Sequence, residues 1–135
     1  MKNSPGCHGE NGILIAVKQD DVRREGGWKM ELLRTEHLCK VYGTGENQVH
    51  ALRDVSFSVE KGEFVAIIGQ SGSGKSTLLH MIGGVDVPSS GHVWVDGSDV
   101  YARNRKELAI FRRRQVGLIY QFYNLIPVLN VVDNM

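Results

Sequence analysis

The hydrophobic positions of the chain indicate a strand, a glycine-rich loop and a helix in direct succession. Apolar and polar residues alternate over residues 54–60, which is the period of a strand with one buried face. Residues 64–68 are apolar throughout, as in a central strand that is covered on both faces. After the loop, residues 76–82 carry a helical pattern that two consecutive glycines end. The pattern predicts an α/β fold.

Further elements flank this unit on both sides. We predict a weaker strand over residues 31–42 and another over residues 92–96, so that the strands around the central one form a mostly antiparallel region. An amphipathic helix is predicted over residues 104–114 and a strand over residues 116–120. Residues 128–135 begin another predicted helix.

Residues 1–29 are mostly polar or glycine, with one short apolar cluster, and we interpret them as a flexible N-terminal extension. Residues 30–135 then form the folded part. Because a parallel core would have few partners for residues 64–68 within this length, we expect an open sheet edge there.

Composition excludes several classes of function. Sixteen Lys and Arg residues against 15 Asp and Glu give a net charge of +1, without the basic surface expected for a nucleic-acid partner. The run Arg112–Arg114 has two interpretations, a phosphate-binding group or a solvated helix end. Cys7 and Cys39 lack the spacing of a zinc site or a disulfide framework. No apolar stretch approaches the roughly 20 residues of a membrane span, so we expect a cytoplasmic chain.

The loop after the central strand carries the strongest chemical signal. It satisfies the pattern G-x-x-x-x-G-K-[ST] of a phosphate-binding loop, with the required strand before it and helix after it. The predicted phosphate-binding residues are Gly69, Gln70, Ser71, Gly72, Ser73, Gly74, Lys75, Ser76 and Thr77.

Each residue type in this loop has a physical role toward a triphosphate. The glycines let backbone N–H groups turn toward phosphate oxygens, and the helix that follows adds the positive end of its dipole. Lys75 is placed to reach the β and γ phosphates, the hydroxyl of Ser76 to bind Mg²⁺, and Thr77 to contact the α phosphate. The alternative is an ordinary glycine-rich turn, but a lysine at a helix start is unfavourable unless an anion accompanies it.

Three elements in order resemble one family in particular. Tyr42 in KVYG, the loop GQSGSGKST and Gln121 in VGLIYQFYNLIP are similar to the N-terminal half of an ATP-binding cassette (ABC) transporter subunit. The resemblance covers residues 30–135 and is greatest to the branch that serves lipoprotein release, macrolide export and antimicrobial-peptide resistance. It implies a P-loop ATPase fold with an antiparallel β region and the start of a parallel core.

The resemblance also implies roles for the two outer elements. Tyr42 would stack on adenine, although a tyrosine that simply ends a strand is the alternative. Gln121 would contact Mg²⁺ and the attacking water, which makes it a catalytic residue together with Lys75; by itself it would be read as a surface amide.

The implied partners are a transmembrane permease and a second ATP-binding subunit. The permease would contact residues Gln121–Pro127 and hold the subunit at the cytoplasmic face of the membrane, and two subunits would bind ATP between them head to tail. The family's signature sequence, acidic Walker B strand and switch histidine have no counterpart in residues 1–135. We therefore expect this chain alone not to hydrolyse ATP. A non-catalytic nucleotide-binding module and a small P-loop kinase are the alternative functions.

Overall fold

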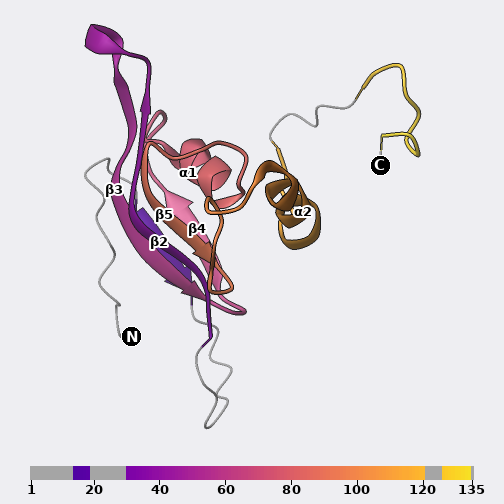
Figure 1. Cartoon of the computed structure of the whole chain (residues 1–135), viewed down its shortest axis with the longest axis horizontal. Helices are drawn as coiled ribbons and strands as arrows, with labels where there is room; N and C mark the ends of the chain where they lie inside the picture. The colour runs from indigo at the N-terminus through magenta and orange to yellow at the C-terminus, as the bar shows by residue number, and fades with distance from the viewer. Residues whose placement is uncertain (1–13, 19–29, 121–125, 135) are drawn as a thin grey trace.

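The computed structural model describes residues 14–18, 30–120 and 126–134 (Figure 1). Their elements, in chain order, are β1 (Leu14–Lys18), β2 (Glu31–Tyr42), the 3₁₀ helix η1 (Gly45–Asn47), β3 (Val49–Glu60), β4 (Phe64–Ile68), α1 (Lys75–Ile82), β5 (Ser90–Val95), β6 (Ser98–Asp99) and α2 (Arg105–Gln115).

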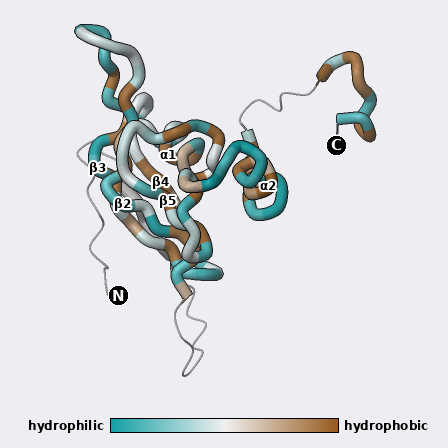
Figure 2. The backbone as a smooth tube through the Cα atoms, in the orientation of Figure 1, coloured by the Kyte–Doolittle hydropathy of each residue, from teal (hydrophilic) through white to brown (hydrophobic). Residues whose placement is uncertain are grey.

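The larger sheet is antiparallel and has the strand order β3-β2-β5-β6. Its main part is the long hairpin of β2 and β3, whose tip projects beyond the rest of the described chain (Figure 1). The tip is largely hydrophilic, whereas brown, apolar segments alternate with polar ones along the body of the strands (Figure 2). The antiparallel region predicted from residues 31–66 and 92–96 is therefore confirmed, with β6 as an additional short strand.

The hairpin contains a register shift that one buried threonine accommodates. Pairing between β2 and β3 shifts between Thr35 and Leu38, and Thr35 is only 1% exposed. Its hydroxyl donates a hydrogen bond to the Val55 carbonyl oxygen at 3.2 Å and accepts one from the Phe57 backbone N–H at 3.1 Å. Since buried backbone groups outside the regular ladder need partners, this hydroxyl replaces the strand contacts that the shift removes.

The hydrophobic core lies between the larger sheet and the helices. Helix α1 contributes Leu78 and Met81, both fully buried, and Phe111 of α2 packs into the same cluster. The buried members of the core are Leu38, Leu52, Val55, Leu78, Met81, Val93, Val100 and Phe111. Among the described residues, neither α1 nor α2 has the length and apolar character to cross a membrane.

Strand β4 pairs antiparallel with β1, from Leu14 opposite Ile68 to Lys18 opposite Phe64. Residues 14–18 lie within the stretch interpreted from sequence as a flexible extension, and they form a strand in the structure. Its partner, β4, is distant in sequence. One edge of β4, expected to be open, is covered by this strand.

Two predicted elements are absent from the described residues. Residues 116–120 form no strand, and residues 126–134 form turns in place of a helix. Within the described chain, residues 116–120 pack against the end of α1: Leu118 lies over Gly83, and the Tyr120 ring is 6.2 Å from that of His80. An apolar run becomes a strand only where another strand offers backbone partners, and this run contacts a helix.

Replacing Thr35 by Val tests the role of the buried hydroxyl. We expect the free energy of unfolding to fall by about 1–3 kcal/mol, because the Phe57 N–H and the Val55 carbonyl lose a shared partner. Thr35→Ser retains the hydroxyl and should lose less. Urea denaturation of the three proteins measures the difference, and equal stability of the Val and Ser variants would contradict it.

Candidate nucleotide-binding site

The phosphate loop connects β4 to α1 as the sequence predicts. Strand β4 ends at Ile68, and helix α1 begins at Lys75. Between them the chain turns, and the Ser73 N–H donates to the Gln70 carbonyl oxygen at 3.2 Å. Gln70, Ser71 and Gly72 are exposed at the outer side of this turn. The loop thus presents its backbone at the end of a strand, where phosphate groups bind in folds of this kind.

Gly74 is the position that allows the helix to begin here. Its φ angle is +97°, a conformation that side chains disfavour. A Cβ atom added at Gly74 would lie 2.2 Å from the Ala51 carbonyl oxygen and 3.2 Å from the Leu52 side chain. Because the first obstacle is β3 backbone, which cannot rotate away, only glycine fits between the loop and the sheet.

The first turn of α1 presents unpaired backbone donors. Gly74 caps the helix without a side chain, and the first intrahelical bond of this turn runs from the Leu78 N–H to the Gly74 carbonyl at 2.8 Å. The N–H groups of residues 75–77 therefore have no acceptor within the helix. Together with the positive end of the helix dipole, they form a site for an anion.

Lys75 adds a positive charge at the same place. Its ammonium donates hydrogen bonds to the carbonyl oxygens of Gly69 and Gln70, at 2.8 and 2.6 Å, and lies 3.4 Å from the Ser73 hydroxyl. The side chain thus folds over the loop. A cation at a helix N-terminus is electrostatically unfavourable by itself, so phosphate oxygens within the loop would stabilise this arrangement.

Ser76 fits the role of a magnesium ligand. It is exposed in the first turn of α1, and its hydroxyl makes no hydrogen bond to another residue of the described chain. Hydroxyl oxygen is a ligand that Mg²⁺ accepts beside phosphate oxygens. The residues present are therefore compatible with binding ATP together with Mg²⁺.

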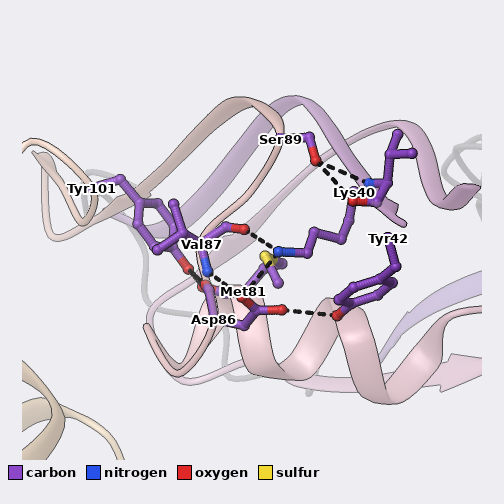
Figure 3. Close-up of polar contacts among 8 residues, drawn as sticks. Lys40, Tyr42, Met81, Asp86, Val87, Ser89 and Tyr101 are labelled. Carbon is purple, nitrogen blue, oxygen red and sulfur yellow. Dashed lines mark hydrogen bonds and ion pairs between the residues drawn. The ribbon is translucent and has the colours of Figure 1, made fainter. Parts of the chain in front are cut away.

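Tyr42 reaches this site from the end of β2. Its side chain is partly exposed, and its hydroxyl donates to Asp86 Oδ2 at 2.8 Å (Figure 3). Burial and the adjacent Asp86 carboxylate raise the pKa of Tyr42, while a hydrogen bond with Thr77 acts in the opposite direction. Tyr42 is therefore brought close to the last residue of the phosphate loop, although the two are far apart in sequence.

Asp86 and Lys40 complete this neighbourhood, and sequence reasoning missed both. Lys40 donates to Asp86 Oδ1 at 2.9 Å, in an ion pair whose lysine side chain is only 12% exposed. Burial raises the pKa of Asp86, but the bonds from Lys40, Tyr42 and the Val87 N–H outweigh it, so the pKa lies below its ordinary value. The available signal was the spacing of Lys40 and Tyr42, which places both side chains on one side of a strand.

Two further predictions from the sequence concern the segment Gln121–Pro127 and the arginines Arg112–Arg114. Gln121 lies outside the described residues, as do residues 122–125 of the predicted permease contact; Ile126 and Pro127 are described and exposed. Arg112 donates to the Gly84 carbonyl oxygen at 2.9 Å, and all three arginines lie exposed in the last turn of α2. Their interpretation as a solvated helix end is confirmed.

The fold and the loop together define a P-loop nucleotide-binding domain. Comparison with known proteins specifies it further, because the profile of the family described as "ABC transporter" matches residues 52–134. The chain belongs to the ABC transporter family.

Individual relatives agree with this assignment. The chain is 50% identical over 103 residues to the "Lipoprotein-releasing system ATP-binding protein LolD" of Bordetella pertussis (strain Tohama I). This match covers 76% of the present chain and 45% of the relative. It is 47% identical over 106 residues to the "Macrolide export ATP-binding/permease protein MacB" of Neisseria gonorrhoeae. That match covers 78% of the present chain and 16% of MacB. The chain thus spans less than half the length of these curated relatives.

A solved structure shows the same fold. The dimeric ATP-binding cassette MJ0796, in a post-hydrolysis state bound to ADP and Pi, superposes with a TM-score of 0.69 at 36% sequence identity. The match covers 76% of this chain and 44% of the cassette. The predicted fold class, a P-loop ATPase fold of the ABC type, is confirmed.

Gly74→Ala should disrupt the phosphate loop, because its Cβ would collide with the Ala51 carbonyl at 2.2 Å. Gly72→Ala is the matched control: Gly72 also has a positive φ, of +78°, but a Cβ there meets nothing within 4 Å. We expect the control to lose about 1–2 kcal/mol of stability and the Gly74 variant clearly more. Thermal unfolding and triphosphate titration measure the stability and the binding of the two variants. Equal effects of the two substitutions would contradict the close approach of Gly74 to the Ala51 backbone.

Proposed function

We propose that this chain is the nucleotide-binding part of the ATP-binding subunit of an ABC exporter, and that it binds MgATP at residues 69–77. The observation that carries the proposal is the convergence of uncapped helix N–H groups and the Lys75 ammonium on one loop. A triphosphate supplies the negative charge that this arrangement lacks. Membership of the ABC transporter family supports ATP as the nucleotide.

In this proposal, each group of residues binds a different part of the nucleotide. The backbone of Gly69–Gly74 and the first turn of α1 surround the phosphates, with Lys75 at the β and γ groups and Thr77 at the α group. The ring of Tyr42, beside Thr77, stacks on adenine. Ser76 binds Mg²⁺, with Gln121 as a second ligand by family resemblance. The ion held there would offset part of the negative charge of the triphosphate.

The larger assembly is also part of the proposal. We infer that a second ATP-binding subunit completes the site head to tail, which the dimeric cassette supports. A permease would contact residues Gln121–Pro127 and hold the subunit at the cytoplasmic face of a membrane. The name of one relative, "Macrolide export ATP-binding/permease protein MacB", supports such a pairing.

Hydrolysis by this chain alone is not part of the proposed function. The family couples ATP hydrolysis to transport, but that reaction needs a group that orients water and a surface from the second subunit. Residues 1–135 contain no apolar strand that ends in an Asp-Glu pair and no S-G-G-Q sequence. We infer that this chain binds nucleotide without turning it over.

Lys75→Ala tests the site directly. We expect affinity for MgATP to fall roughly 10- to 100-fold, because the charge-assisted bonds to phosphate are lost. Lys61→Ala is the control, since Lys61 is exposed in the turn before β4 and away from the loop. Calorimetric titration measures both affinities, and unchanged binding by the Lys75 variant would refute the site. Release of phosphate above background by the unmodified chain would refute the absence of turnover.

A further inference from the structure

Asp86 joins the end of β2 to the segment that follows α1. Its two carboxylate oxygens have different partners: Oδ1 accepts from the Lys40 ammonium at 2.9 Å, and Oδ2 accepts from the Tyr42 hydroxyl at 2.8 Å (Figure 3). Lys40 also donates to the Val87 carbonyl oxygen at 2.6 Å. The carboxylate is thus fully engaged by two side chains of the same strand.

Lys40 also contacts the Tyr42 ring. The ammonium lies 4.8 Å from the ring centroid, within the range of a cation–π interaction. Because the lysine occupies one face of the ring, a flat ligand can stack only on the other face. The side chain of Tyr42 is 40% exposed, which leaves surface for such a ligand.

The segment that carries Asp86 is itself fixed to the C-terminal end of α1. The Val85 N–H donates to the His80 carbonyl oxygen at 2.9 Å. The Tyr101 hydroxyl lies 2.5 Å from the Met81 carbonyl oxygen and 2.6 Å from that of Asp86, so it joins the helix end to this segment (Figure 3). Since α1 begins at the phosphate loop, Asp86 and the loop are attached to the two ends of one short helix.

We propose that Asp86 and Lys40 are positioning residues for the base of the nucleotide. They hold the Tyr42 ring at a fixed place relative to the phosphate loop, and so set how much the base adds to triphosphate affinity without touching the nucleotide themselves. The inference rests on the proposed function, because it assumes that Tyr42 is the surface on which adenine stacks.

The hydrogen bond between the Tyr42 hydroxyl and the Asp86 carboxylate can be altered from either residue. Tyr42→Phe deletes the hydroxyl but keeps the ring, and it leaves the ion pair of Asp86 with Lys40 in place. Asp86→Asn removes the negative charge while keeping the shape of the side chain. The matched control is Asp54→Asn, because Asp54 also pairs with a neighbouring side chain, His37 at 2.6 Å, but lies elsewhere on the hairpin.

The measured quantity is the ratio of the Kd for magnesium tripolyphosphate to the Kd for MgATP, taken on the full chain. We expect Tyr42→Phe and Asp86→Asn to lower this ratio about 3- to 10-fold, the usual size of one lost hydrogen bond. The Kd for tripolyphosphate should stay within about twofold, since no phosphate contact changes. Asp54→Asn should leave both constants unchanged. A general loss of folding would weaken both ligands together and so leave the ratio as it was.

Tyr42→Ala separates this inference from the proposed function. If it lowers the ratio while Tyr42→Phe and Asp86→Asn do not, the ring binds the base but Asp86 does not position it, and the inference is refuted. If Tyr42→Ala leaves the ratio unchanged, Tyr42 is not the adenine surface, and that part of the proposed function fails with it. If Asp86→Asn does not fold, Tyr42→Phe by itself decides between these outcomes.

Discussion

The site depends on one close approach between backbones. Helix α1 can begin beside β3 only because Gly74 has no side chain, since a Cβ would lie 2.2 Å from the Ala51 carbonyl oxygen. This contact brings the first turn of α1, with its unpaired N–H groups and Lys75, to the end of β4. The buried side chains of Leu78 and Met81 then hold the helix in that position. The packing of α1 and the position of the proposed anion-binding site are therefore consequences of the same constraint.

The short helix has a second consequence at its other end. Its eight residues separate the phosphate loop from the segment that contains Asp86, and both ends are held by hydrogen bonds to neighbouring groups. Tyr42 contacts the segment beyond the C-terminal end of α1 through its hydrogen bond to Asp86. A flat base and a triphosphate would thus be bound by parts of the chain that one helix connects.

Relatives about twice as long or longer share this part of the fold, and the described residues show how its edge is covered here. Strand β1 pairs with β4 along five residues, so the backbone groups of one edge of β4 are satisfied by the chain's own N-terminal segment. Unpaired strand edges favour association with other chains. Antiparallel pairing with residues 14–18 reduces that exposure on this side.

The sequence alone determined the elements whose residues carry their own pattern. The alternation over residues 54–60, the apolar run of β4 and the spacing from Gly69 to Thr77 predicted the strand, the loop and its chemistry. Only the tertiary structure showed that residues 14–18 pair with β4, that residues 116–120 pack on α1, and that Asp86 joins Lys40 to Tyr42. The physical reason is that these outcomes depend on partners far away in the chain, which no local periodicity encodes.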